Sequence, residues 1–293
     1  MTPVDVIVLD LDGESMLSLC LESIAKQKYL PARVIVWDNG SREPVTARIP
    51  GNFPFELRIE RSDGNLGFTG GINQAMALVT APFVAWLNND AQLDREWLEV
   101  LMREFETDER LGAVQSRIRR DEFILDGAGI DISSGTYVQA GHGVPISGYV
   151  ESRPPWGVSA TAALYRTSAL RSTALGPAVL HPAFFAWYED VELCARLHEG
   201  GWRTRVVAKV LAAHQGSASV SRIGRRARLL RARNRYWTAR LHPGVGRISA
   251  LLAEDLRITA RLLAALKVHA MLYHVAGIAL GLLGRIDTLP GRR

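Results

Sequence analysis

Polar residues that could do chemistry gather at four places in the chain, each directly after an apolar segment. They are Asp38-Asn39-Gly40-Ser41, residues 65–73, Asn88-Asn89-Asp90 and Tyr188-Glu189-Asp190. In open α/β sheets, ligands bind just beyond the carboxyl ends of the strands. A carboxylate there, such as Asp90, can hold a divalent cation, because hard cations prefer oxygen ligands and keep substrate phosphates in their shell. The alternative is structural, since Asn88-Asn89-Asp90 would also cap a helix predicted over residues 93–105.

The first two clusters contain the residue types of a nucleotide site. An Asp at a strand end, such as Asp38, can accept a hydrogen bond from the N3–H group of uracil or thymine, but Asn-Gly is also an ordinary turn signal. In the second cluster, Gly67, Gly70 and Gly71 come just before a predicted helix. Backbone can approach a ligand closely at glycine, and a helix N-terminus favours phosphate. The spacing matches neither a dinucleotide-binding fingerprint nor a P-loop.

The fourth cluster places two adjacent carboxylates, Glu189 and Asp190, after a run of aromatic residues. A carboxylate held against aromatic rings is desolvated, and this tunes its pKa for general-base catalysis. The alternative is that acids in a first helical turn complement the helix dipole, which contributes about 0.3–1 kcal/mol. His214 follows beyond a predicted strand and could return to a metal, although a lone histidine is more often structural.

The hydrophobic pattern predicts the elements that would position these clusters. Short apolar runs typical of buried strands cover residues 4–9, 33–37, 57–60, 83–87 and 112–117. Helical spacing covers residues 14–27, 70–79 and 93–105. This alternation predicts an α/β fold with a mainly parallel sheet and helices on both faces. A loop-and-hairpin insertion is expected over residues 119–157, then a helix over 190–199, a strand over 203–207 and helices from Ile223 onward.

Charge is unevenly distributed along the 293 residues. The net charge is +5, but residues 216–293 hold 15 Lys+Arg against 3 Asp+Glu, whereas residues 1–215 hold 20 against 27. Arginines are densest over residues 222–237, together with Tyr236 and Trp237. This stretch is either an interfacial helix that meets anionic lipid or a lipid-pyrophosphate acceptor, or a helix that packs on the acidic body. No nucleic-acid motif is present, so no nucleic-acid partner is expected.

Several features bear on the expected compartment. Residues 270–284 are apolar but shorter than the ~20 residues that span a bilayer. No signal peptide is visible, and two cysteines do not indicate a disulfide framework. We therefore expect a cytoplasmic protein that is soluble or peripheral on the inner face of the cell membrane.

Taken in order, the motifs resemble glycosyltransferase family 2, and more narrowly its rhamnosyltransferase-like branch, over roughly residues 4–240. The resemblance implies a GT-A fold, a divalent cation (Mg²⁺ or Mn²⁺) and inverting transfer from a nucleotide-diphosphate sugar, and Asp38 favours dTDP or UDP as the nucleotide. Asp38 would then bind the base, Asp90 and His214 the metal, and Asp190 would be the catalytic base. The sequence departs from the family pattern at two places: Asn88 replaces an acid of the metal motif, and Asp10-Leu11-Asp12 stands where many members carry Tyr-Asn.

The remaining site residues follow from the same alignment of motifs. Donor contacts are expected from Asn65, Gly67, Gly70, Asn73, Asn88 and Asn89, and acceptor or sugar contacts from Trp156, Trp187, Tyr188 and Glu189. We expect a catalytic domain over residues 1–215, with a nucleotide-binding part up to about residue 118 and an acceptor part over residues 119–215. A basic and apolar helical region would follow over residues 216–293.

These observations predict an enzyme that transfers a sugar, such as rhamnose, to a hydroxyl of a cell-surface polysaccharide or glycolipid precursor. Its partners would be a nucleotide-sugar donor and a saccharide or lipid-linked acceptor. One alternative is a sugar-phosphate nucleotidyltransferase, which would need a basic Gly-rich loop after the first strand; residues 10–15 hold one Gly and no basic residue. The other is a non-enzymatic binder of anionic surfaces that uses only the basic tail.

Overall fold

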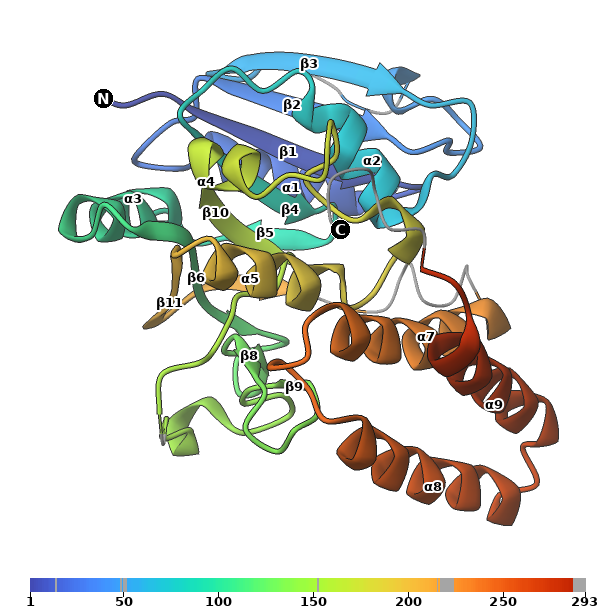
Figure 1. Cartoon of the computed structure of the whole chain (residues 1–293). Helices are drawn as coiled ribbons and strands as arrows, with labels where there is room; N and C mark the ends of the chain where they lie inside the picture. The colour runs from blue at the N-terminus through green and yellow to red at the C-terminus, as the bar shows by residue number, and fades with distance from the viewer. Residues whose placement is uncertain are drawn as a thin grey trace.

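The computed structural model describes residues 1–13, 15–47, 49, 52–151, 153–214, 216 and 224–286. Nine strands of this described part form one sheet in the order β3-β2-β1-β4-β10-β6-β11-β5, with β7 paired to β6 (Figure 1). Neighbouring strands from β3 to β4 are parallel, as are β6 and β11, while β10, β5 and β7 run antiparallel to their partners. The predicted α/β fold with a mainly parallel sheet is confirmed.

The central strands are buried on both sides, which explains their unbroken apolar sequences. The strands of the large sheet are β1 (Val4–Asp10), β2 (Arg33–Asp38), β3 (Glu56–Arg61), β4 (Phe83–Asn88), β5 (Ala91–Leu93), β6 (Leu111–Arg119), β7 (Leu125–Gly127), β10 (Ala162–Arg166) and β11 (Arg203–His214). A separate pair, β8 (Ile130–Asp131) and β9 (Val138–Gln139), lies in the predicted insertion.

Helices cover both faces of the sheet. Helices α1 (Ser15–Ala25) and α3 (Trp97–Thr107) bury their apolar sides in one core cluster. Helices α2 (Gly67–Met76), α4 (Thr167–Ser172) and α5 (Glu189–Glu199) do so in a second cluster on the other face. Cys20 and Cys194 are free and lie in different clusters, so neither takes part in a disulfide.

Several boundaries differ from the sequence-based expectation. Helix α2 begins at Gly67 rather than Gly70, and α3 begins at Trp97 because residues 91–93 form the short strand β5. Strand β10 was not predicted, and β11 continues to His214 rather than ending at Val207. The longer β11 matters, because it carries His214 to the edge of the sheet where the polar clusters meet. Glu14, the first residue of the predicted first helix, lies outside the described residues.

The described part of the basic region forms helices α7 (Arg225–Leu241), α8 (Ile248–Ala264) and α9 (Val268–Leu283). Glycines in α9 let it approach α7 closely: a Cβ at Gly277 would lie 2.4 Å from the Leu229 carbonyl oxygen, and one at Gly281 would lie 2.8 Å from that of Arg233. Among the described residues, no helix combines the length and apolar character needed to cross a membrane. Arg222 and Ile223 lie outside the described residues.

Candidate active site

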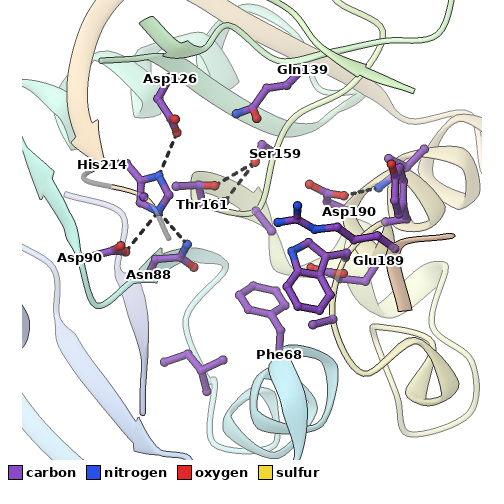
Figure 2. A pocket seen from close by; sticks show the side chains of 18 of the residues that line it. Phe68, Asn88, Asp90, Asp126, Gln139, Ser159, Thr161, Glu189, Asp190 and His214 are labelled. Atoms are coloured by element: carbon purple, nitrogen blue, oxygen red, sulfur yellow. Dashed lines mark hydrogen bonds and ion pairs between the residues drawn. The ribbon is translucent and has the colours of Figure 1, made fainter. Parts of the chain in front are cut away.

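One cavity of about 840 Å³ collects most of the predicted site residues at the carboxyl edge of β1 and β4 (Figure 2). Residues from α2, the end of β4, the end of β11 and the start of α5 line it, which joins segments far apart in the sequence. The predicted residues among its lining are Asn65, Gly67, Asn88, Asn89, Asp90, Trp187, Tyr188, Glu189, Asp190 and His214.

At one side of the cavity, His214 lies between two carboxylates. Its Nε2 atom is 3.2 Å from Asp90 Oδ1 and 3.3 Å from Asn88 Nδ2, while its Nδ1 atom is 2.8 Å from Asp126 Oδ2. Burial alone would lower the pKa of His214, but the hydrogen bonds and charges of Asp126 and Asp90 outweigh it and raise the pKa to about 9. Without a cation, the imidazolium therefore holds the two carboxylates together.

Asp90 and His214 fit a divalent cation as two of its ligands. Asp90 is 7% exposed, so its carboxylate faces the cavity rather than bulk water. Asp126 accepts from Nδ1 of His214, the kind of second hydrogen bond that orients metal-bound imidazoles. Within the described ranges, no group of three or more His, Cys, Asp or Glu side chains is arranged to hold an ion. Other ligands would come from water or a diphosphate, as is usual for Mg²⁺.

The carboxylates of Glu189 and Asp190 lie across the cavity from His214 (Figure 2). Burial raises the pKa of Asp190, while hydrogen bonds from the Val191 and Ala160 backbone and from Ser159 oppose this shift. Burial, and then the charge of Asp190, raises the pKa of Glu189 well above its usual range. Glu189 Oε2 is buried without a hydrogen-bond partner. The pKa of both acids is raised, and Asp190 has more hydrogen bonds that oppose the rise than Glu189 has.

The turn before these acids has an unusual backbone. Phe185, Trp187 and Tyr188 have positive φ values of 66°, 68° and 66°. Non-glycine residues in this region are strained and persist where the surrounding structure holds them, most often at functional sites. Gly67 faces this turn with φ 73°, and a Cβ there would lie 2.4 Å from the Phe185 carbonyl oxygen. The start of α2 and the turn before α5 therefore form one tightly packed wall.

Helix α7 holds the same turn from outside the large sheet. Nδ2 of the fully buried Asn234 lies 2.8–2.9 Å from the carbonyl oxygens of Phe184, Ala186 and Trp187. Arg233 fixes the Asn234 amide, because its Nε donates to Oδ1 at 2.9 Å. Within the turn, the Phe184 carbonyl oxygen also accepts from the Ala186 N–H, and Asn234 adds a donor to it and to the carbonyl oxygens of Ala186 and Trp187.

Asp38 takes part in a network behind the cavity and does not line it. Its carboxylate accepts from the backbone N–H groups of Ser41 and Val45 at 2.8 and 3.2 Å and from Arg61 at 2.6 Å, and the side chain is 1% exposed. Burial opposes ionisation, but the hydrogen bonds from Ser41 and Val45, with the charge of Arg61, lower the pKa of Asp38. Its neighbour Asn39 lines the cavity instead.

Three further predicted contacts also lie outside the residues that line the cavity. Asn73 exchanges two hydrogen bonds with the Leu180 backbone, at 2.8 and 2.9 Å, and so joins α2 to the segment before α5. The Trp156 ring lies 5.0 Å from the His198 ring and packs against the second core cluster. Gly70 lies inside α2 and faces Leu66. Contacts of these residues with a substrate stay predictions.

Several residues of the site were not predicted from the sequence. Asp126 orients His214, and Asp10 holds Asn89 through a 2.6 Å hydrogen bond. Ser159 and Asn234 support the acidic side of the cavity. Asp126-Gly127 has the pattern of a turn, and Asn234 is one polar residue among arginines, so neither carries a local signal. Asp10 ends an apolar strand as Asp38 does, and an acid at a strand end could have marked it as a site residue.

Comparisons with known proteins agree with this architecture. The family model described as glycosyl transferase family 2 matches residues 5–171, more than half of the chain. No curated protein matches the sequence.

Three solved structures share the fold at low identity. S. aureus TarS 1–349 in complex with UDP-GlcNAc is 18% identical, with TM-score 0.55, over 82% of this chain and 65% of that one. The mannosyltransferase PcManGT from Pyrobaculum calidifontis, with GDP-Man and Mn²⁺, is 14% identical, with TM-score 0.57, over 97% and 88%. GalNAc-T7 with UDP, GalNAc and Mn²⁺ is 12% identical, with TM-score 0.59, over 82% and 48%.

The chain thus spans less than two thirds of the TarS fragment and about half of GalNAc-T7. At these identities the structures show the fold, which is GT-A-like, while the match over residues 5–171 shows the family. The chain belongs to glycosyltransferase family 2.

Proposed function

We propose that this protein transfers a sugar, with inversion, from a nucleotide-diphosphate donor to a hydroxyl of a saccharide or lipid-linked acceptor, and that it depends on a divalent cation. The observation that supports this most strongly is the cavity itself. It brings a carboxylate–imidazole pair, Asp90 and His214, into the same space as the half-buried side chain of Asp190. Transfer from a sugar diphosphate needs both functions, one for the leaving group and one for the acceptor proton.

The donor diphosphate would lie at the side of the cavity formed by α2 and β4. Asn65 and Gly67 line the cavity at the N-terminal end of α2, where the helix dipole favours phosphate. Asp90 and His214 would hold Mg²⁺ or Mn²⁺, which would stabilise the negative charge that develops on the departing diphosphate. Asn89, fixed by Asp10, is positioned to contact the donor beside Asp90.

Asp190 would act as the general base. It would accept the proton of the acceptor hydroxyl while that oxygen forms a bond to the anomeric carbon. The bond from the anomeric carbon to the diphosphate oxygen breaks at the same time, and its electron pair leaves with the nucleoside diphosphate. One base and one displacement on the opposite face of the sugar give inversion. Burial raises the pKa of Asp190, as suits a general base, and Ser159 and the backbone groups that donate to Asp190 limit that rise.

Glu189, Trp187 and Tyr188 are proposed to contact the sugars. The unpaired Glu189 Oε2 could receive a sugar hydroxyl, and the Trp187 ring lies in the cavity wall with Arg231 4.9 Å above it. The choice of UDP or dTDP rests on Asp38, whose carboxylate would have to release Arg61 to accept a base N3–H. Rhamnose as the transferred sugar rests on the order of the sequence motifs, and a donor screen decides it.

The proposed division of labour follows the chain. Residues 1–118 would bind the nucleotide, residues 119–215 would bind the acceptor, and residues 216–293 would form a helical region that supports the site. Asn234 of α7 already reaches the turn before Glu189. The helical region is therefore proposed to belong to the functional unit.

The proposal is tested by comparing two substitutions in nucleotide-sugar turnover. Asp190→Asn should abolish sugar transfer, or the slow hydrolysis of the donor. It should leave metal-dependent binding of the nucleoside diphosphate nearly intact. Asp90→Ala should weaken that binding. Turnover is followed as released nucleoside diphosphate, with circular dichroism as the control for folding. A binder that uses only its basic tail would tolerate both substitutions, and that result would overturn the proposal.

A further inference from the structure

A second cavity, of about 760 Å³, lies between helices α7, α8 and α9. Its volume is within the range of small-molecule sites, roughly 300–1,000 Å³. Its lining combines basic side chains of α7 and of the α8–α9 connection with apolar groups that include Ile258, Leu266 and Val268. This mixture is suited to a ligand that is anionic at one end and apolar at the other.

The basic side of this cavity carries charge that the protein does not neutralise. Within the described part of the chain, no carboxylate lies within ion-pair distance of Arg225, Arg228 or Lys267, which all line it. The one acidic lining residue, Glu254, is paired with Arg235 at 2.7 Å. Cations held together without counter-ions repel one another, so an anion that enters between them gains this energy back.

Apolar side chains contribute to the same part of the molecule. Ile258, Leu266 and Val268 line the cavity, and Leu266 is 84% exposed. Further leucines of α8 and α9 outside the lining, Leu256, Leu263 and Leu272, are each more than half exposed. Exposed leucines on neighbouring helices mark a surface that contacts lipid or another apolar partner. A basic face beside exposed leucines is the arrangement by which helices meet phosphorylated lipids.

The two cavities share part of their lining. Tyr188 and Arg231 line both, and Tyr188 directly precedes the acidic pair Glu189 and Asp190. A ligand anchored between α7 and α9 would therefore extend past Tyr188 toward the proposed base. This is where an acceptor hydroxyl has to be placed.

We propose that the cavity between α7, α8 and α9 binds the phosphate or pyrophosphate of a lipid-linked acceptor. The anionic group would contact Arg225, Arg228 and Lys267, and the hydrocarbon chain would lie against Ile258, Leu266 and Val268. The sugar of the acceptor would point past Tyr188 into the first cavity. This inference rests on the proposed transfer reaction and names the class of its acceptor.

The test is calorimetric titration of the full chain with three probes in EDTA, so that no metal ion holds a diphosphate in the first cavity. The probes are farnesyl pyrophosphate, inorganic pyrophosphate and farnesol. Farnesyl pyrophosphate should bind at least ten-fold more tightly than either of the others. The double variant Arg228→Glu/Lys267→Glu should lose at least ten-fold of that affinity. Arg257→Glu, the same charge change on an exposed α8 residue outside the cavity lining, should bind as the wild type does.

Equal affinity of wild type and double variant for farnesyl pyrophosphate, with both folded by circular dichroism, would overturn the inference. So would binding to phosphatidylglycerol vesicles that the double variant loses, without binding of farnesyl pyrophosphate, because the basic surface would then serve the membrane alone. A parallel titration with nucleoside diphosphates and Mn²⁺ keeps the two proposals apart. Nucleotide binding without lipid-pyrophosphate binding rejects only the acceptor site, and the reverse rejects only the donor site.

Discussion

At the scale of single residues, His214 shows how one side chain depends on partners that the sequence places far away. Asp126 precedes it by a long stretch of chain, yet its carboxylate lies 2.8 Å from Nδ1 and fixes the orientation of the ring. Asp90, Asp190 and His214 were predicted from the sequence because each has a residue type and a position that suit catalysis. Asp126 was not, because its role exists only once β7 and β11 have both paired with the end of β6.

Asp126→Asn tests this positioning role. The amide can still occupy the site but cannot carry the charge that orients His214, and losing such a partner typically weakens metal affinity about 10–100-fold. We expect the Mn²⁺ dependence of nucleotide binding to shift to higher Mn²⁺ by that factor, measured by titration of Mn²⁺ at fixed nucleoside diphosphate. Asp131→Asn is the matched control, because Asp131 lies in the same insertion but pairs with Arg153. An unchanged Mn²⁺ titration for Asp126→Asn would contradict the assignment.

At the scale of elements, the turn before α5 and the helix α7 form one unit. The pattern of the sequence predicted both the strands that build the site and the helix that carries Asp190. It did not predict β10, because Ala162–Arg166 is short and pairs antiparallel between two strands distant in the sequence. It did not predict the turn either, since three positive φ values at Phe185, Trp187 and Tyr188 are imposed by neighbours such as Asn234 rather than by local preference.

Asn234→Ala should uncouple this unit. It removes the side-chain donor to the carbonyl groups of Ala186 and Trp187 and one of the donors to that of Phe184, at a cost of about 1–3 kcal/mol. Because the turn positions Asp190, we expect kcat to fall at least ten-fold while KM for the donor changes little. Thr238→Ala removes another buried polar group of α7, one that bonds only within the helix, and serves as the control. If kcat fell by a similar factor in both variants, Asn234 would only stabilise the helix.

At the scale of the whole molecule, the helical region is attached to the catalytic sheet through a buried charge cluster. Glu192 of α5 accepts two hydrogen bonds from Arg196, both at 2.8 Å, and lies 3.3 Å from His242 at the end of α7. The basic charge of residues 222–237 predicted either lipid contact or packing on the body. In the described part of this stretch, Leu230, Tyr236 and Trp237 are buried, while Arg225 and Arg228 are exposed, so the apolar residues pack and lipid contact by the basic residues stays a prediction.

This cluster predicts acid sensitivity. Burial alone would raise the pKa of Glu192, but the charge of Arg196 and the hydrogen bonds from His242 and Arg196 outweigh it and lower the pKa to about 2. A carboxylate whose pKa is lowered by folding stabilises the folded state at pH values above its unfolded-state pKa, which is near 4.5. This stabilisation is lost as the pH falls toward 2. This lowering of the Glu192 pKa corresponds to a contribution on the order of 3 kcal/mol to the free energy of unfolding.

Urea unfolding between pH 6 and pH 2, expressed as a difference between wild type and Glu192→Gln, measures this contribution. The wild type should lose stability more steeply below about pH 4.5 than the variant, which has no carboxylate to protonate. Parallel curves for the two proteins would show that Glu192 does not link the two regions electrostatically. Glu199→Gln, a change in an exposed acid at the other end of α5 that also contacts His242, provides the comparison.

The most direct measurement of the central claim is a thermal-shift screen of the full chain against UDP, dTDP, GDP, ADP and CDP, each with Mn²⁺ and with EDTA. A ligand that binds only the native state raises the apparent stability by mass action. The account predicts a metal-dependent rise with UDP or dTDP, and loss of that rise in Asp90→Ala. No shift with any nucleotide and Mn²⁺, in a protein that unfolds cooperatively, would contradict the claim that this cavity is the donor site of a glycosyltransferase.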